Sequence, residues 1–141
     1  RVIDLFAGSG ALGLECLSRG ASFCLFVDHS NEARAAIQSN IDAMQLAPVT
    51  RIQRRSAHSL GERPVHFDEG FDIACLDPPY GQGLVEPALN MLRSGDWLSD
   101  AAILVLETAK DEEIGLDGWS IHDERTYGAA SIRFISRSAD A

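Results

Sequence analysis

The chain has 141 residues, 45% of them hydrophobic and 23% charged, and this balance excludes an intrinsically disordered protein. The length suits a single domain over residues 1–141, and no apolar run approaches the roughly 18 residues of a membrane-spanning segment. Twelve basic side chains against 21 acidic ones give a formal net charge of −9. Taken alone, this charge argues against a nucleic-acid partner, because phosphate contacts need Lys and Arg.

Apolar residues alternate between strand and helix periodicity along the chain. In chain order they predict a strand over 2–6, a helix over 11–19, a strand over 22–28, a helix over 31–44 capped by Ser30, strands over 49–54 and 71–76, a helix over 84–93 and a strand over 101–107. Two last strands, 119–124 and 131–136, indicate an antiparallel pair around Tyr127-Gly128. Residues 61–70 indicate a surface loop. Repeated strand–helix units followed by a hairpin predict an α/β protein with a mostly parallel sheet and helices on both faces.

The first predicted strand begins at Val2, directly after Arg1, with neither a Met nor a turn before it. Natural domains seldom begin inside a core strand, so we expect that a native N-terminal extension precedes these residues. The three cysteines form no CxxC pair and the start of the chain carries no export signal. We therefore expect a reduced, cytoplasmic protein without a metal site.

A glycine-rich turn joins the first strand to the first helix. Gly8-Ser9-Gly10-Ala11-Leu12-Gly13 matches G-x-G-x-x-G in the strand–turn–helix context that gives the motif its meaning. Its backbone N–H groups favour a negative or polar ligand group. Asp28, at the end of the second strand, can accept hydrogen bonds from both ribose hydroxyls of an adenosine ligand. Dinucleotides and S-adenosylmethionine both fit this arrangement, and a turn without a ligand is the simplest alternative.

Asp4 favours S-adenosylmethionine over a dinucleotide. It lies in the first strand, four residues before Gly8. A carboxylate there can hold the ammonium group of the methionine part, directly or through water, and NAD has no ammonium group. That Asp4 instead caps the amides of the loop itself is equally compatible with the sequence.

The tetrapeptide Asp77-Pro78-Pro79-Tyr80 closes the fourth strand, at the sheet edge where open α/β proteins bind their ligands. Its residue types suit methylation of an exocyclic amino group on a planar base, whose lone pair is delocalised into the ring. The Asp77 carboxylate and the Pro78 carbonyl can each accept one N–H and localise that lone pair, and the prolines keep both acceptors aimed. Tyr80 offers a flat face for stacking, and the base must be unpaired or flipped out. An ordinary strand-ending turn is the alternative.

With these residues, the chain resembles the class I S-adenosylmethionine-dependent methyltransferases, and more closely the bacterial 16S rRNA (guanine-N2)-methyltransferase D family. The resemblance rests on residues 4–15 and 71–80 and continues through 83–84, 97–98, 105–107 and 127–128. It implies a Rossmann-like, mostly parallel seven-stranded sheet of order 3-2-1-4-5-7-6 with strand 7 antiparallel.

The same resemblance implies S-adenosyl-L-methionine as the cofactor and a guanine of 16S rRNA, free or in a small-subunit assembly particle, as the substrate. It makes the turn 77–80 the catalytic site, with Asp77, Pro78, Pro79 and Tyr80 as its residues. It implies cofactor binding by Asp4, Phe6, Ala7, Gly8, Ser9, Gly10, Asp28, Ser56 and Ala57. The chain departs from the family by having Asp at position 28, where Glu is more frequent, and Ser at position 56, where an acidic or amide residue often contacts the adenine. The family's basic N-terminal extension, which helps to engage RNA, is absent here, which explains part of the acidic charge.

Other polar residues have simpler interpretations. His29 and His58 are expected to line the cofactor pocket, and the four histidines show no metal-ligand spacing. The basic cluster of Arg51, Arg54, Arg55 and Arg63 is interpreted as a solvated strand edge, with an RNA-facing role as the alternative. Residues 111–113 are predicted to begin a solvated helix, and Trp97 is assigned to the core.

These patterns together predict a monomeric enzyme that methylates the exocyclic amine of an RNA base, most specifically guanine N2 of 16S rRNA. Three alternatives stay open. A DNA adenine-N6 methyltransferase uses the same acceptor chemistry but usually needs a target-recognition domain. An NAD-binding oxidoreductase gives the Pro-Pro-Tyr turn no role, and a catalytically silent binding module is the third.

Overall fold

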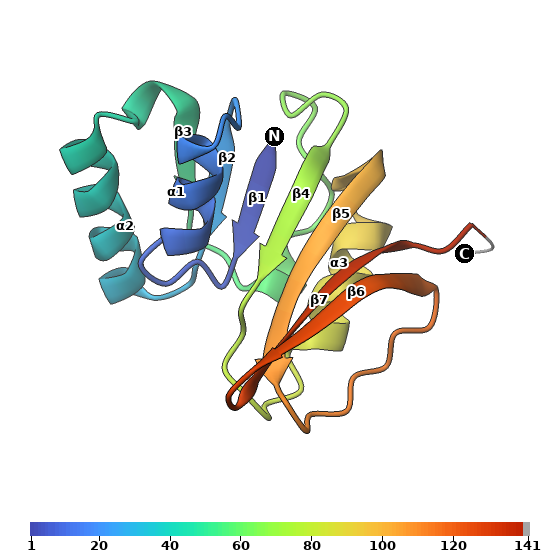
Figure 1. Cartoon of the computed structure of the whole chain (residues 1–141). Helices are drawn as coiled ribbons and strands as arrows, with labels where there is room; N and C mark the ends of the chain where they lie inside the picture. The colour runs from blue at the N-terminus through green and yellow to red at the C-terminus, as the bar shows by residue number, and fades with distance from the viewer. Residues whose placement is uncertain (140–141) are drawn as a thin grey trace.

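One seven-stranded sheet organises the computed structural model, which describes residues 1–139 (Figure 1). The strand order is β3-β2-β1-β4-β5-β7-β6, which confirms the predicted order. The strands are β1 (Val2–Leu5), β2 (Cys24–Val27), β3 (Thr50–Gln53), β4 (Phe71–Leu76), β5 (Leu98–Ala109), β6 (Trp119–Tyr127) and β7 (Ala130–Arg137). From β3 across to β5 every neighbouring pair is parallel, and β7 is antiparallel to both β5 and β6.

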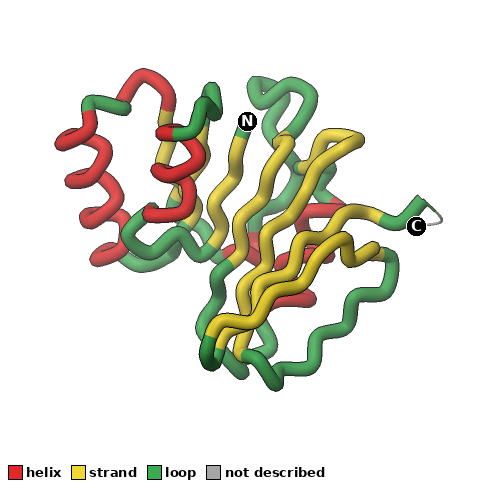
Figure 2. The backbone as a smooth tube through the Cα atoms, viewed as in Figure 1, coloured by secondary structure: helices red, strands yellow, loops and turns green. Residues whose placement is uncertain are grey.

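Helices cover both faces of the sheet, as predicted. In the view of Figures 1 and 2, α1 (Ala11–Ser18) lies in front of β2 and β3, α2 (Asn31–Met44) lies to the left of β3, and α3 (Val85–Ser94) lies behind β5. Two short 3₁₀ turns, η1 (Ala47–Val49) and η2 (Ala57–Ser59), flank β3. The Ser30 hydroxyl accepts the Ala33 N–H at 3.2 Å and so caps the start of α2, where the sequence placed it.

The front core depends on a close approach between α1 and the sheet. A Cβ atom at Gly13 would lie 2.6 Å from Cys24 Sγ and 2.6 Å from a Phe26 ring carbon, so only glycine lets the helix lie this close. Ile37 and Ile41 of α2 bury their side chains in the same cluster. The helix that follows the glycine loop is thereby held firmly against the strands.

The back core contains a group of aromatic rings that corrects one expectation. Residues 61–70 are irregular, as predicted, but they are not merely a surface loop, because Phe67 is buried with its ring 5.5 Å from Phe71 and 6.4 Å from Trp97. Trp97 is fully buried, as predicted, and its Nε1 donates to the Gly61 carbonyl at 2.8 Å. A single aromatic anchor has no periodicity, so the sequence pattern did not reveal it.

Two further segments differ from their predictions. β5 begins at Leu98 rather than at 101, because its register against β4 shifts between Phe71 and Ile73 and so extends the pairing. Residues 111–113 form a turn and loop instead of a helix start. Their acidic side chains correctly indicated a segment in contact with solvent, but the predicted helix is wrong.

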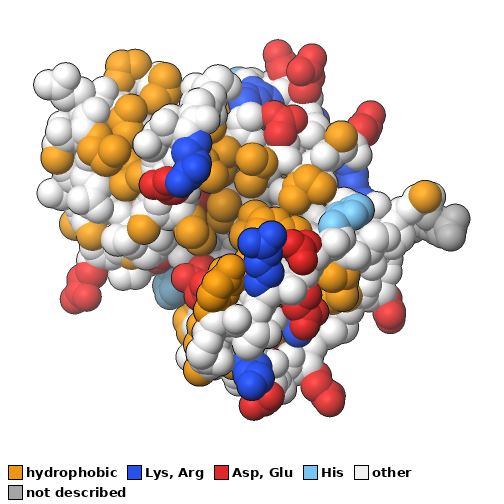
Figure 3. All heavy atoms as spheres, viewed as in Figure 1, with side chains coloured by type: hydrophobic (Ala, Val, Ile, Leu, Met, Phe, Trp, Pro, Cys, Tyr) orange, Lys and Arg blue, Asp and Glu red, His pale blue; other side chains and the backbone are white. Residues whose placement is uncertain are grey.

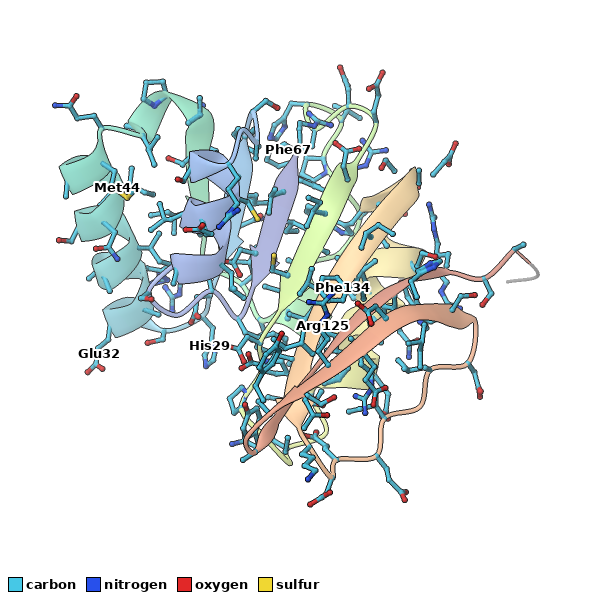
Figure 4. The ribbon with its side chains drawn as sticks, in the orientation of Figure 1. His29, Glu32, Met44, Phe67, Arg125 and Phe134 are labelled. Atoms are coloured by element: carbon cyan, nitrogen blue, oxygen red, sulfur yellow. The ribbon has the colours of Figure 1, made fainter. Side chains whose placement is uncertain are left out.

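The hairpin of β6 and β7 forms one edge of the sheet. β6 is the edge strand, its residues 121–127 are all exposed, and its register against β7 shifts between Ile121 and Asp123. Its middle carries charged side chains of both signs, and Arg125 is paired with Asp123 at 3.1 Å. Figure 3 shows hydrophobic side chains gathered on the front face beside these charges, and Figure 4 places Arg125 and Phe134 together there.

Candidate active site

The parallel strands β1, β2, β3 and β4 bring their carboxyl ends to one edge of the sheet, the lower edge in Figure 1. Open α/β sheets bind ligands at this edge. A hollow of about 480 Å³ opens there, a size typical of small-molecule sites. It is lined by Phe6, Gly8, Val27, Asp28, His29, Ser30, Ala33, Arg55, Ala57, Asp77, Pro78, Pro79 and Tyr80.

The loop after β1 has a backbone conformation that favours glycine. Gly8 and Gly10 have φ angles of +59° and +82°, and Phe6, at the entry to the loop, has a φ of +57°. A positive φ is uncommon in a residue with a side chain, and such strain is frequent where a binding site is shaped. The loop turns so that the Gly8 N–H donates to Asp28 at 3.0 Å.

Asp28 forms the wall of the hollow at the end of β2. Its Oδ2 accepts the Gly8 N–H and its Oδ1 accepts the Ser30 N–H at 2.9 Å, so the carboxylate is fixed from both sides. The side chain is only 11% exposed, yet it lines the hollow. Each carboxylate oxygen keeps a further lone pair, which suits two neighbouring hydroxyl groups of a ribose.

Asp4 lies beneath α1 and not in the hollow. It is 1% exposed, and its Oδ2 accepts the Gly13 N–H at 3.0 Å. Burial raises the pKa of Asp4 to about 8, against a smaller lowering effect of the Gly13 hydrogen bond. The structure thus shows the loop-capping role that the sequence left as an alternative, and contact between Asp4 and an ammonium group stays a prediction.

The structure brings together half of the residues predicted to bind the cofactor. Those that line the hollow are Phe6, Gly8, Asp28, His29 and Ala57. Those that do not line it are Asp4, Ala7, Ser9, Gly10, Ser56 and, from the histidine prediction, His58. Gly10 and Ala7 still shape the loop, since the Gly10 N–H donates to the Ala7 carbonyl at 2.8 Å. His29 is well exposed, at the lower end of α2 in Figure 4.

Sequence reasoning missed four residues of the hollow, namely Val27, Ser30, Ala33 and Arg55. Arg55 follows β3, which ends beside β2, so the shared edge of parallel strands could have indicated it. The predicted basic cluster does not act as one surface, because Arg63 is largely buried and donates to the Asp96 backbone at 2.6 Å. Only Arg55 of that cluster reaches the hollow.

The turn 77–80 forms the opposite wall and includes all four predicted catalytic residues. The Asp77 carboxyl has Glu107 as an acidic neighbour, and the Tyr80 hydroxyl donates to Glu107 Oε2 at 3.3 Å. Partial burial and then the neighbouring Glu107 raise the pKa of Asp77 to about 6. Sequence reasoning gave no role to Glu107, although Glu107 ends the strand predicted over 101–107 and Asp77 directly follows the strand predicted over 71–76.

Tyr80 also borders a second hollow of about 440 Å³. The end of β5 and the turn between β6 and β7 complete its lining, through Ala109, Lys110, Asp111, Glu112 and Ala129, together with Gly81. Glu112 Oε1 accepts the Gly81 N–H at 3.1 Å and so ties the segment after Tyr80 to the loop after β5. The Tyr80 ring therefore stands between two open spaces, 45% exposed.

Residues 1–139 hold neither a cluster of metal ligands nor a membrane-spanning helix. No three His, Cys, Asp or Glu side chains of this part of the chain converge in the way that metal ligands do. None of its helices is both long enough and apolar enough to cross a membrane.

Comparison with known proteins decides the family. A protein-family model described as conserved hypothetical protein 95 matches residues 1–136. The ribosomal RNA small subunit methyltransferase D of Escherichia coli K12 is 30% identical over 141 residues, 97% of this chain and 68% of that protein. The chain belongs to this methyltransferase D family. The Haemophilus influenzae member is 31% identical over 133 residues, covering 93% of this chain and 68% of its own length.

Solved structures repeat the architecture of the family. A Haemophilus influenzae protein solved as a candidate methylase superposes with a TM-score of 0.84 at 29% identity, covering 97% of this chain and 86% of that one. A candidate methyltransferase of Escherichia coli gives a TM-score of 0.82 at 30% identity, covering 98% of this chain and 75% of that one. The fold is the Rossmann-like fold of class I methyltransferases, and membership of the family makes the protein a methyltransferase.

Proposed function

We propose that this protein transfers a methyl group from S-adenosylmethionine to the N2 amino group of a guanine in 16S rRNA. The observation that carries the proposal is the shared hollow, in which the glycine loop and Asp28 face the turn 77–80. A site for an adenosine-type cofactor therefore adjoins a site that accepts hydrogen bonds from an amine. The names of the relatives, which are rRNA small subunit methyltransferases, support the methylation of ribosomal RNA.

The residues of the hollow fit S-adenosylmethionine. Asp28, fixed by two backbone N–H groups, is placed to hold the ribose hydroxyls, and Gly8 of the adjoining loop lines the hollow on the side that suits the methionine part. Ala57 and Phe6 supply apolar surface for the adenine. When bound, the cofactor supplies an electrophilic methyl group on a sulfonium.

The turn 77–80 is suited to making an amine nucleophilic. The Asp77 carboxylate and the Pro78 carbonyl each accept one N–H of the substrate amine, which draws its nitrogen toward tetrahedral geometry. With its lone pair localised, the nitrogen could take the methyl group that a bound sulfonium cofactor would supply, leaving the thioether, and Asp77 or water would accept the extra proton. Positive charge grows on nitrogen in this step, and a carboxylate already in place stabilises it.

The substrate guanine can enter the site only when it is not paired within an RNA stem. Amino groups of paired bases are engaged in pairing, so the guanine is unpaired in the substrate or is flipped out by the enzyme. The half-exposed Tyr80 ring offers the face on which this base stacks, worth about 1–3 kcal/mol. The proposal includes action as a monomer in the cytoplasm on free 16S rRNA or on a small-subunit assembly particle.

The test is methyl transfer to unmodified substrate. The protein is incubated with labelled S-adenosylmethionine and either 30S subunits or 16S rRNA from cells lacking the modification, and the labelled base is mapped. The expected product is N2-methylguanine. A label only on adenine N6 in a DNA substrate would contradict the proposal in favour of the DNA enzyme.

A second measurement tests the cofactor separately. Calorimetry should show binding of S-adenosylhomocysteine and none of NADH. Tight NADH binding without any homocysteine-analogue binding would overturn the assignment of the hollow.

A further inference from the structure

Two carboxyl groups, those of Asp77 and Glu107, follow the last paired residues of β4 and β5. The last paired residues of these parallel strands are Leu76 and Leu106, so Asp77 and Glu107 follow in the same register and point to the same face. Glu107 is the acidic neighbour that contributes to the raised pKa of Asp77, and its Oε2 accepts the Tyr80 hydroxyl at 3.3 Å. The pair is therefore a built feature of the site, held by two strands and one tyrosine.

No cation neutralises this pair within residues 1–139. The ion pairs of the described chain join other residues. Arg133, on the neighbouring strand β7, donates to Glu124 at 3.1 Å and to the Thr108 hydroxyl. Across residues 1–139, Tyr80 is the one side chain that donates a hydrogen bond to this pair, so most acceptor positions of the two carboxyl groups stay open. Such a pair without a cation is an unfavourable arrangement that a ligand with two adjacent N–H donors would relieve.

Among the bases that carry an exocyclic amine, guanine alone presents such an edge. Its N2 amine lies next to N1–H, a second donor. In adenine and cytosine the amine lies next to a ring nitrogen with a lone pair, which is an acceptor. A charged carboxylate beside that lone pair would repel it.

We propose that Glu107 accepts the N1–H of the target guanine while Asp77 accepts its N2–H, so that Glu107 determines which base is methylated. The proposal rests on the proposed function and adds a specificity-determining residue to it. Tyr80 acts on Glu107 as a positioning residue, through the hydroxyl hydrogen bond, in addition to offering its ring to the base.

The experiment pairs a protein change with a base change. Once the methylated guanine is mapped, 30S particles are reconstituted from 16S rRNA that carries 2-aminopurine at that nucleotide. 2-Aminopurine keeps the 2-amino group but has a lone pair in place of N1–H. The protein should prefer guanine over 2-aminopurine in kcat/KM by about 10- to 100-fold, the discrimination of one well-formed base contact.

Glu107→Gln should remove most of this preference. The Gln amide can turn its NH₂ toward the N1 of 2-aminopurine or its carbonyl toward the N1–H of guanine, so the two rates should come within about threefold of each other. Glu113→Gln is the matched control, because Glu113 is exposed on the loop after β5, and it should keep the full preference. Tyr80→Phe should slow both substrates while keeping the guanine preference, since the Glu107 carboxylate stays.

The outcomes separate the two proposals. If the unaltered protein puts no methyl group on guanine N2, the proposed function fails and the role of Glu107 fails with it. If guanine N2 is methylated but Glu107→Gln keeps the full preference, only the role of Glu107 is wrong. S-adenosylhomocysteine affinity close to that of the unaltered protein checks that Glu107→Gln is folded, and Glu107→Ala, which should lose the preference by slowing guanine alone, gives a second test.

Discussion

At the scale of single residues, two aspartates on the same face of the sheet have different surroundings. Asp4 is almost completely buried and holds the Gly13 N–H, whereas Asp77 lines the hollow beside Glu107. Burial raises both pKa values, to about 8 for Asp4 and to about 6 for Asp77. We infer that Asp77 is ionised and reactive at neutral pH, while Asp4 acts mainly as a part of the loop.

Asp77→Asn should reduce methyl transfer strongly. The amide keeps the shape of the side chain but loses the negative charge that stabilises the methylated amine, so kcat should fall by about 10²- to 10³-fold. The S-adenosylhomocysteine affinity from calorimetry should stay near that of the unaltered protein. Methyl transfer at the full rate in this variant would contradict the role given to Asp77.

The pH profile of kcat/KM should report the titration of Asp77. Asp77 accepts an N–H only when ionised, so activity should rise with pH through an apparent pKa near 6. Because Glu107 contributes to the raised pKa, Glu107→Gln should move the acid limb to lower pH. An acid limb that stays in place in this variant would show that Glu107 does not influence Asp77.

Asp4→Asn should change stability more than binding. Since the pKa of Asp4 is raised above the value of an unfolded aspartate, folding takes up a proton at intermediate pH. Stability from this group is then greatest at acidic pH and falls as the pH rises toward about 8. Asp4→Asn should flatten that slope in urea unfolding, and exposed Asp100→Asn should not. A large loss of S-adenosylmethionine affinity in Asp4→Asn would support contact with the ammonium group instead.

At the scale of elements, the position of α1 against the sheet sets the geometry of the glycine loop. Gly13→Ala puts a methyl group 2.6 Å from Cys24 Sγ and from the Phe26 ring, and neither neighbour lies at the free end of a flexible chain. This overpacking should cost about 1–3 kcal/mol in the free energy of unfolding and should weaken cofactor binding by moving the loop. Gly115→Ala, whose added Cβ meets nothing closer than 3.8 Å, is the control and should do neither.

The elements also show how far the sequence predicts this protein. Periodicity and turn residues sufficed for the parallel strands, the helices and the position of the two motifs, because each depends on neighbours along the chain. The Phe67 anchor and the longer β5 were missed, because they depend on packing and register between distant segments. The turn 77–80 could be predicted because its residues are adjacent in the sequence. The role of Glu107 could not, because it depends on the pairing of β4 with β5.

At the scale of the whole molecule, the distribution of charge limits what these residues do alone with RNA. Residues 67–141 hold five basic and fifteen acidic side chains, and Arg19, Arg63, Arg125 and Arg133 are paired with carboxylates. We expect weak RNA binding with a shallow salt dependence, corresponding to at most about three phosphate contacts. Filter binding at several salt concentrations, from low to physiological, measures how RNA affinity depends on salt. A steep fall in affinity with salt would contradict this expectation and indicate a basic RNA-binding surface.

The exposed edge strand β6 has a consequence for the behaviour of the protein in concentrated solution. An edge strand presents unpaired backbone groups that can add a strand from another molecule and so start aggregation. Here the register shift between Ile121 and Asp123 bends that edge, and the adjoining charges make a second strand costly to place. Replacing Asp123 and Arg125 by valine would leave the hollow untouched and turn the same edge into a template for fibrous assembly.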